Sequence, residues 1–161
     1  MDIERIYINN NDMEIFSENK KAYFNYEIKE KFRAGVVLTG QEVKSIRLGR
    51  ISLAGSYVVF KDSQIYLIGA KIPAYQPKNA SANYNPERPR KLLLNKSEIN
   101  YLIGKSSEKG LTLIPIKVYT ENAKIKLEFG IARGKKKYDK KETIRKREDQ
   151  REIDNELKIR G

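Results

Sequence analysis

The chain has 161 residues and a formal net charge of +12, a length that suits one domain with extensions. It contains no Cys and no His, which excludes disulfides, thiolate or imidazole metal sites and His-dependent catalysis. No apolar run approaches the roughly 20 residues of a membrane-spanning helix, and the acidic start lacks a signal-peptide core. We therefore expect a soluble, cytoplasmic protein with no membrane partner.

Positive charge is unevenly distributed along the chain. Residues 1–18 carry one Arg against five Asp or Glu, a net charge of −4. Residues 133–161 carry 12 Lys or Arg against 7 Asp or Glu, a net charge of +5, so residues 19–132 carry the remaining +11. A basic body with 10 Tyr suits nucleic acid, because its charges can contact phosphates and its rings can stack on bases. The alternative is a basic surface with no fixed partner.

Apolar residues alternate with polar ones in several short segments, which predicts a mainly β domain. Residues 1–18 form an acidic N-terminal extension, expected to be frayed or loosely docked. About six strands follow, over residues 25–38 (interrupted at Gly35), 57–60, 64–68, 92–94, 111–119 and 124–132. Short strands at this spacing predict a closed or partly closed antiparallel barrel over residues 19–133.

Two helices are predicted between the strands. Thr39 and Glu42 have the spacing of a capping box, so a short helix is expected to begin there and to end near Gly49. Asn95 and Glu98 repeat the signal before a second helix that ends before Gly110. Residues 73–90 hold four of the five prolines and show no periodicity, which predicts a long loop that is functional or disordered.

The C-terminal tail, residues 134–161, is strongly polar. After Tyr138 its apolar side chains are Ile144, Ile153, Leu157 and Ile159, too few to offset the roughly 1–2 kcal/mol per residue that ordering a backbone costs. We expect a tail that is disordered when free and becomes helical on binding. Its first eight residues contain five lysines and Tyr138, a composition that favours RNA over a merely solvated tail.

A metal-dependent nuclease is the enzymatic alternative. Glu42 and Lys44 form an E-x-K step, which can belong to a Mg²⁺ site in nucleases. The nearest upstream Asp is Asp12, 30 residues earlier. Capping also accounts for Glu42, so we expect neither catalysis nor a cofactor.

Several longer stretches resemble one family. They are NKKA (19–22), AGVVLTGQEVKSIRLG (34–49), SYVVF (56–60), RKLLLN (90–95) and IARGKKKYDKKETIRKRE (131–148). These stretches, in this order, resemble small protein B (SmpB), the tmRNA-binding (SsrA RNA-binding) family of bacterial trans-translation. The resemblance covers about residues 19–160.

The resemblance implies an OB-like antiparallel barrel with two to three flanking helices. It implies binding, as one copy, to the tRNA-like domain of tmRNA and delivery of alanyl-tmRNA to stalled ribosomes. The tail would probe the empty decoding centre and mRNA channel of the small ribosomal subunit. A generic OB-type single-stranded RNA-binding protein or a ribosomal protein is the alternative.

The resemblance and the basic pattern together nominate two sets of residues. The candidate tmRNA contacts are Lys20, Lys21, Arg33, Lys44, Lys91, Leu92, Asn95, Lys124 and Lys126. The candidate decoding-centre contacts are Gly134, Lys135, Lys136, Tyr138, Asp139, Lys140, Lys141 and Arg145. Many family members have Glu at position 33 and His at position 138, so an RNA contact at Arg33 would differ, while stacking at Tyr138 would be retained.

Overall fold

The computed structural model describes residues 13–160, with the side chains of residues 13–136 and 140–158. Its strands are β1 (Ile15–Glu18), β2 (Tyr26–Val36), β3 (Tyr57–Lys61), β4 (Gln64–Ile68), β5 (Arg90–Leu93), β6 (Leu111–Glu121) and β7 (Lys124–Gly134). Its helices are α2 (Lys20–Asn25), α3 (Gly40–Arg47), α4 (Lys96–Ser106) and α5 (Lys137–Arg160), and a 3₁₀ turn covers Pro77–Asn79. None of the helices that the structure describes is long and apolar enough to cross a membrane.

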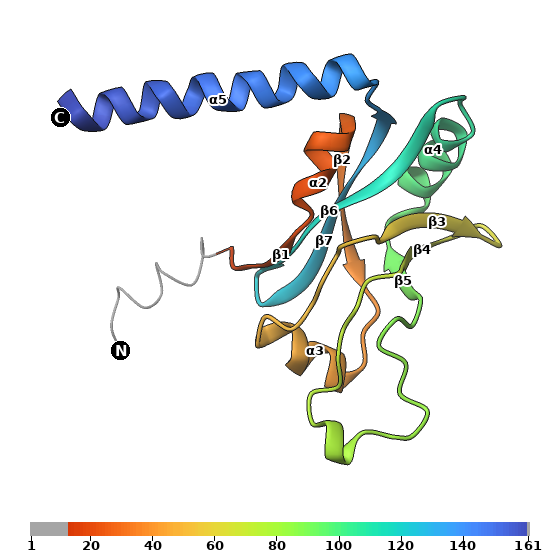
Figure 1. The fold of residues 1–161 in the computed structure, drawn as a ribbon. Helices are drawn as coiled ribbons and strands as arrows, with labels where there is room; N and C mark the ends of the chain where they lie inside the picture. The colour runs from red at the N-terminus through yellow and green to blue at the C-terminus, as the bar shows by residue number, and fades with distance from the viewer. Residues whose placement is uncertain (1–12, 161) are drawn as a thin grey trace.

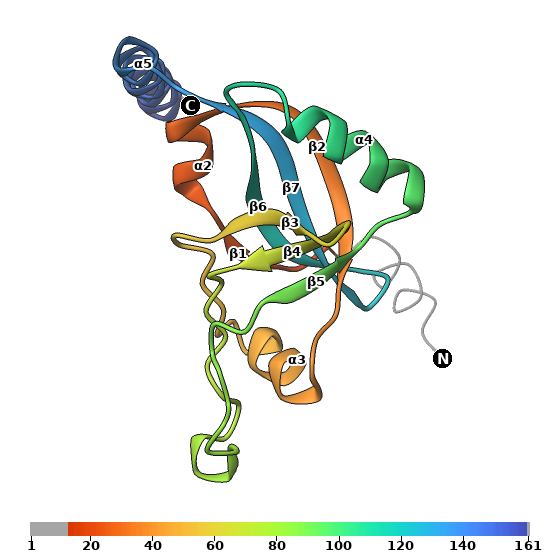
Figure 2. The same cartoon turned by 90° about the vertical axis from the view of Figure 1, so that its right-hand side faces the viewer.

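The strands form one antiparallel sheet that closes on itself (Figures 1 and 2). Its order is β1-β6-β3-β4-β5-β2-β7, and β7 also pairs along the length of β6. The six strands β2–β7 therefore make a ring without free edges, which confirms the mainly β, antiparallel prediction. The seventh strand was not predicted: Ile15–Glu18, assigned to the N-terminal extension, form β1 on β6.

Two hairpins of the sheet turn tightly. Asp62 and Ser63 between β3 and β4, and Asn122 and Ala123 between β6 and β7, all have positive φ. A two-residue turn in which both residues have positive φ has a backbone twist that fits the right-handed twist of the strands it joins. Lys124 directly follows the β6–β7 turn and therefore lies at one end of the sheet.

The interior of the ring is a continuous apolar core. Buried side chains of β2, β4, β6 and β7 fill it, and Ile46 of α3 and Leu102 of α4 pack against them. Gly130 of β7 lies where β2 bulges at residue 29, and a Cβ there would meet the Glu30 carbonyl oxygen at 2.8 Å. The two strands can approach this closely because position 130 has no side chain.

The predicted caps are confirmed. Thr39 Oγ1 accepts from the Glu42 amide at 3.3 Å, and the Glu42 carboxylate accepts from the Thr39 amide at 2.9 Å. Asn95 Oδ1 accepts from the Glu98 amide at 2.9 Å and so begins α4. The short helix α2 was not predicted, because it is six residues long and its only buried residue is Ala22.

The expectation that the tail is disordered when free and helical on binding stays a prediction. In the structure the tail forms α5, a continuous helix that crosses one end of the closed sheet and extends beyond it (Figure 1). Most of the described side chains of α5 are exposed, which agrees with the lack of a continuous apolar stripe in its sequence. Its first turns are held by polar contacts to α2, which sequence spacing does not reveal.

Candidate RNA-binding surface

The β6–β7 turn and α3 enclose a cationic groove, here called the hairpin-end groove. Its volume is about 400 Å³. Arg47 of α3 donates to the Ala123 carbonyl at 3.3 Å, which fixes the helix against the turn. Lys124 and Lys126 alternate with Ile125 along β7, so their side chains leave the same face of the strand. The floor is apolar and the rim is cationic; the lining is Gly35, Val36, Leu38, Val43, Arg47, Leu93, Lys124, Ile125 and Lys126.

The groove combines the two features that an RNA needs. Cations on the rim can neutralise phosphates, and apolar walls can accept an unstacked base or a ribose. Leu93 is the largest exposed apolar side chain on its wall, with 52 % of its surface accessible. Of the nominated residues, Lys124 and Lys126 are brought together here.

Leu92 was nominated in error as a side-chain contact. It is 1 % exposed and lies in the core, while its neighbour Leu93 points outward. Successive residues of a strand face opposite sides, and β5 is paired so that Leu93 lies opposite Gly35. Leu93 therefore occupies the surface position that the prediction assigned to Leu92.

Three other nominated residues have interaction partners within the protein. Arg33 forms an exposed ion pair with Glu121 at 3.4 Å. The Asn95 side-chain oxygen caps α4, and the nomination of Asn95 as an RNA contact stays a prediction. Lys44 places its ammonium 5.5 Å from the centre of the Tyr75 ring, and Lys91 is half-buried in β5.

Lys20 and Lys21 lie in a second groove, away from Lys126. Asn19, just before Lys20, donates hydrogen bonds to the carbonyl oxygens of Pro115 and Ile116 in the middle of β6. Pro115 pairs with Phe129, which lies three residues from Lys126 along β7. The structure therefore divides the nominated tmRNA residues between two grooves that share no lining residue.

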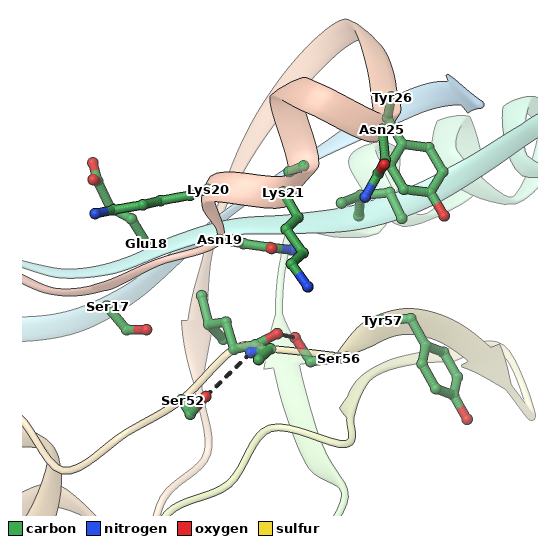
Figure 3. A pocket seen from close by; sticks show the side chains of 15 residues that line it. Ser17, Glu18, Asn19, Lys20, Lys21, Asn25, Tyr26, Ser52, Ser56 and Tyr57 are labelled. Atoms are coloured by element: carbon green, nitrogen blue, oxygen red, sulfur yellow. Dashed lines mark hydrogen bonds between the residues drawn. The ribbon is translucent and has the colours of Figure 1, made fainter. Parts of the chain in front are cut away.

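This second groove, the α2 groove, has a volume of about 580 Å³ and separates α2 from the segment that leads into β3 (Figure 3). Lys21 and Asn25, one helical turn apart, come from the α2 wall, and Tyr57 stands across from them. Ser52 and Ser56 come from the opposite wall. Its polar and aromatic lining with two lysines also suits nucleic acid.

The decoding-centre candidates begin at this same end. Gly134 ends β7, and Lys135 donates to the Tyr23 carbonyl at 2.8 Å and to Thr143 Oγ1 at 2.7 Å. Lys136, Lys141 and Arg145 are exposed, and Lys140 is half-buried. The side chains of Tyr138 and Asp139 lie outside the described residues, so their nomination remains a prediction.

Two contacts of α5 were not expected from the sequence. Arg147 lies over the Phe24 ring, 5.9 Å from its centre, and Arg151 lines a small pocket beside Tyr23. Together with Lys135, these residues join α5 to α2. No local pattern in the sequence predicts these contacts, because the residues that they join lie more than 100 positions apart.

Glu42, the residue behind the nuclease alternative, is buried in an ion-pair cluster. Its carboxylate accepts from Arg88 and from Arg90 Nε, the latter at 2.7 Å. Burial alone would raise the pKa of Glu42, but hydrogen bonds from Arg88, the Thr39 amide and Arg90 outweigh it and hold the pKa below 4.5. Both carboxylate oxygens are thus occupied.

The same cluster holds two arginines of the basic run at residues 88–91. Arg90 is fully buried and donates to the carbonyl oxygens of Ala70 and Pro86 as well as to Glu42. It supports the fold and cannot reach RNA. Among the described residues, no three acidic side chains gather in a way that would hold a metal ion.

The comparisons with known proteins agree with this geometry. The family model described as SmpB protein matches residues 16–159. The chain is 48% identical over 146 residues to the SsrA-binding protein of Carboxydothermus hydrogenoformans, covering 91% of this chain and 97% of that protein. It is 49% identical over 144 residues to the SsrA-binding protein of Acetivibrio thermocellus, covering 89% and 93%.

A solved structure extends the likeness to the fold. It is described as "tmRNA-SmpB: a journey to the center of the bacterial ribosome" and is 45% identical, with a TM-score of 0.62. The match covers 80% of this chain and 93% of the solved one. Family model, relatives and fold agree over most of the chain, and the chain belongs to the SmpB protein family.

Proposed function

We propose that this chain binds tmRNA (SsrA RNA) and acts in trans-translation on the ribosome, in the cytoplasm. The observation that carries the proposal is the match to SsrA-binding proteins over nine-tenths of the chain, at 48% identity for the Carboxydothermus relative. The proposed role is binding, since the family is RNA-binding and Glu42 is committed to a buried ion-pair cluster. One copy would deliver alanyl-tmRNA to a stalled ribosome.

The body would hold the tRNA-like domain at the hairpin-end groove. Lys124, Lys126 and Arg47 supply three cations around an apolar floor, a combination that supports phosphate contact with one base or ribose packed between them. Lys20 and Lys21 line the α2 groove, which shares no lining residue with the hairpin-end groove. We assign them to a different part of the bound RNA.

The tail would act at the opposite end of the molecule. α5 leaves β7 beside α2, while the hairpin-end groove lies at the far end of β2 and β7 (Figure 1). This separation supports a division of labour in which the body carries the RNA and residues 134–160 enter the empty decoding centre and mRNA channel. Entry would require release of the contacts that join the tail to α2.

Charge reversal at the groove tests the RNA-binding half of the proposal. The double variant Lys124→Glu/Lys126→Glu should lower affinity for the isolated tRNA-like domain at least tenfold and flatten its salt dependence, by about 0.7–0.9 in log–log slope per lost phosphate contact. The control Lys105→Glu/Lys109→Glu makes the same charge change at the end of α4 and should lose much less affinity. Equal affinity of the unaltered protein for unstructured RNA would favour the generic single-strand binder instead.

A further inference from the structure

A third groove lies between α3 and the connection from β4 to β5, here called the α3–loop groove. Figure 2 shows this connection extending past α3 at the end of the sheet opposite α5. The volume of the groove is about 580 Å³. Its lining is Thr39, Gly40, Gln41, Glu42, Lys44, Ser81, Asn83, Tyr84, Asn85 and Arg88.

The walls of this groove are fixed before any ligand arrives. Arg88 and Arg90 tie the end of the loop to Glu42 on α3. The Tyr84 hydroxyl donates to the Ile72 carbonyl at 2.6 Å, which holds the ring in place. A ligand that enters therefore meets a preorganised site and loses little free energy in ordering it.

The groove is cationic. Glu42 is the one acidic residue among its lining residues, and it is paired with two guanidinium groups. Lys44 adds an exposed ammonium at the rim. An anionic ligand is favoured over a neutral or cationic one.

The uncommitted polar groups suit a nucleobase. Gln41 and Asn83 are exposed, and their side-chain amides make no hydrogen bond within the part of the chain that the structure describes. Each amide offers both a donor and an acceptor, as the edge of a base requires. The half-buried ring of Tyr84 adds an aromatic surface on which an unpaired base can stack.

The α3–loop groove adjoins the surface already assigned to RNA. Helix α3 separates it from the hairpin-end groove: Val43 and Arg47 line one, and Gln41 and Lys44 line the other. The two grooves therefore lie on either side of one short helix, within reach of a single bound RNA.

We propose that the α3–loop groove binds one unpaired nucleotide of the RNA held at the hairpin-end groove. Tyr84 stacks on its base, Gln41 and Asn83 hydrogen-bond to the base edge, and Lys44 contacts its phosphate. The inference rests on the proposed function for the presence of the RNA, and it adds a site that reads a base rather than only charge and shape.

The test uses the full chain, the tRNA-like domain of tmRNA, and chemical probing of base edges with and without protein. The unaltered protein should protect one unpaired base that Gln41→Ala/Asn83→Ala leaves reactive, and this variant should bind about tenfold more weakly. Both residues are exposed, so the variant should fold as before, which its melting temperature checks. The control Asn100→Ala/Gln150→Ala removes two exposed amides on α4 and α5 and should change neither readout.

The outcomes separate this inference from the proposed function. Unchanged affinity and protection in Gln41→Ala/Asn83→Ala, while the unaltered protein binds the RNA, would overturn the pocket alone. Weaker binding with the same base still protected would also overturn it, because base reading would be absent. If Gln41→Ala/Asn83→Ala binds the RNA normally but fails in peptide tagging, the groove contacts a ribosomal partner, and the proposal that it binds a nucleotide is overturned. Failure of the unaltered protein to bind the tRNA-like domain would instead overturn the proposed function.

Discussion

Arg90 Nε donates to Glu42 Oε2 at 2.7 Å, and the two side chains are 0 % and 1 % exposed. The pair joins β5 to the first turn of α3, and Arg88 contacts the other oxygen of the same carboxylate. This cluster fixes α3 between the two grooves at the hairpin end. The geometry of the candidate RNA-binding surface therefore depends on a buried carboxylate that is paired with two arginines.

Removing the charge of Glu42 should strongly destabilise the protein. Glu42→Gln leaves the buried Arg90 without its counter-ion, so we expect a loss of about 3–5 kcal/mol in the free energy of unfolding. Denaturation in urea measures it. Glu108→Gln breaks the exposed pair with Lys105, and this matched change should cost less than about 1 kcal/mol. Similar losses in both variants would contradict the structural role of the cluster.

The same carboxylate should make stability dependent on pH. The pKa of Glu42 is lowered in the folded state from its ordinary value of 4.5, so the unfolded chain binds the extra proton first as pH falls. Stabilisation by Glu42 is complete above pH 4.5 and is lost as pH falls through the lower, folded pKa. Melting temperatures between pH 3 and pH 7 should therefore fall less steeply toward acid in Glu42→Gln than in the unaltered protein. Parallel pH profiles would contradict this linkage.

Removing the hydroxyl of Tyr119 should not harm the fold. This residue is 1 % exposed, and its hydroxyl has no hydrogen-bond partner among the described residues. An unsatisfied buried polar group costs about 1–3 kcal/mol, so Tyr119→Phe should leave stability unchanged or raise it by about 1 kcal/mol. Thermal melting measures it. Tyr84→Phe, which loses a 2.6 Å hydrogen bond to Ile72, should instead lower stability.

A methyl group at position 130 should disrupt the contact between β2 and β7. The added Cβ of Gly130→Ala would meet the Glu30 carbonyl oxygen at 2.8 Å and Ile28 Cγ2 at 2.9 Å. Overpacking of this kind costs about 1–3 kcal/mol. Gly104→Ala in α4, where nothing lies within 4 Å of the new atom, is the control and should be neutral or stabilising. Chemical denaturation compares the two.

Truncation should separate RNA binding from action on the ribosome. The closed sheet is complete at Gly134, so deletion of residues 138–161 should leave the body folded and its affinity for the tRNA-like domain within about twofold, since the proposed phosphate contacts at Lys124, Lys126 and Arg47 lie in the body. Peptide tagging on stalled ribosomes should be abolished. A large loss of RNA affinity would show that α5 belongs to the RNA-binding surface.

The sequence by itself determined the elements whose causes are local. Alternation predicted the strands, Thr39 and Asn95 predicted the helix starts, and the residues at 34–49 and 131–148 identified the family. Each signal acts within a few residues, through side-chain direction or capping. The absence of His and Cys excluded disulfides, thiolate or imidazole metal sites and His-dependent catalysis. This exclusion follows from the composition and does not depend on the fold.

Tertiary structure alone decided which of the nominated residues meet. It placed Arg90 inside with Glu42, Leu92 in the core and Leu93 on the surface, and it put Lys20 and Lys126 in different grooves. It also joined α5 to α2 through Lys135, and β1 to β6. These outcomes depend on strand register and on contacts between residues far apart in the chain, and a one-residue change of register reverses which side chain faces the core.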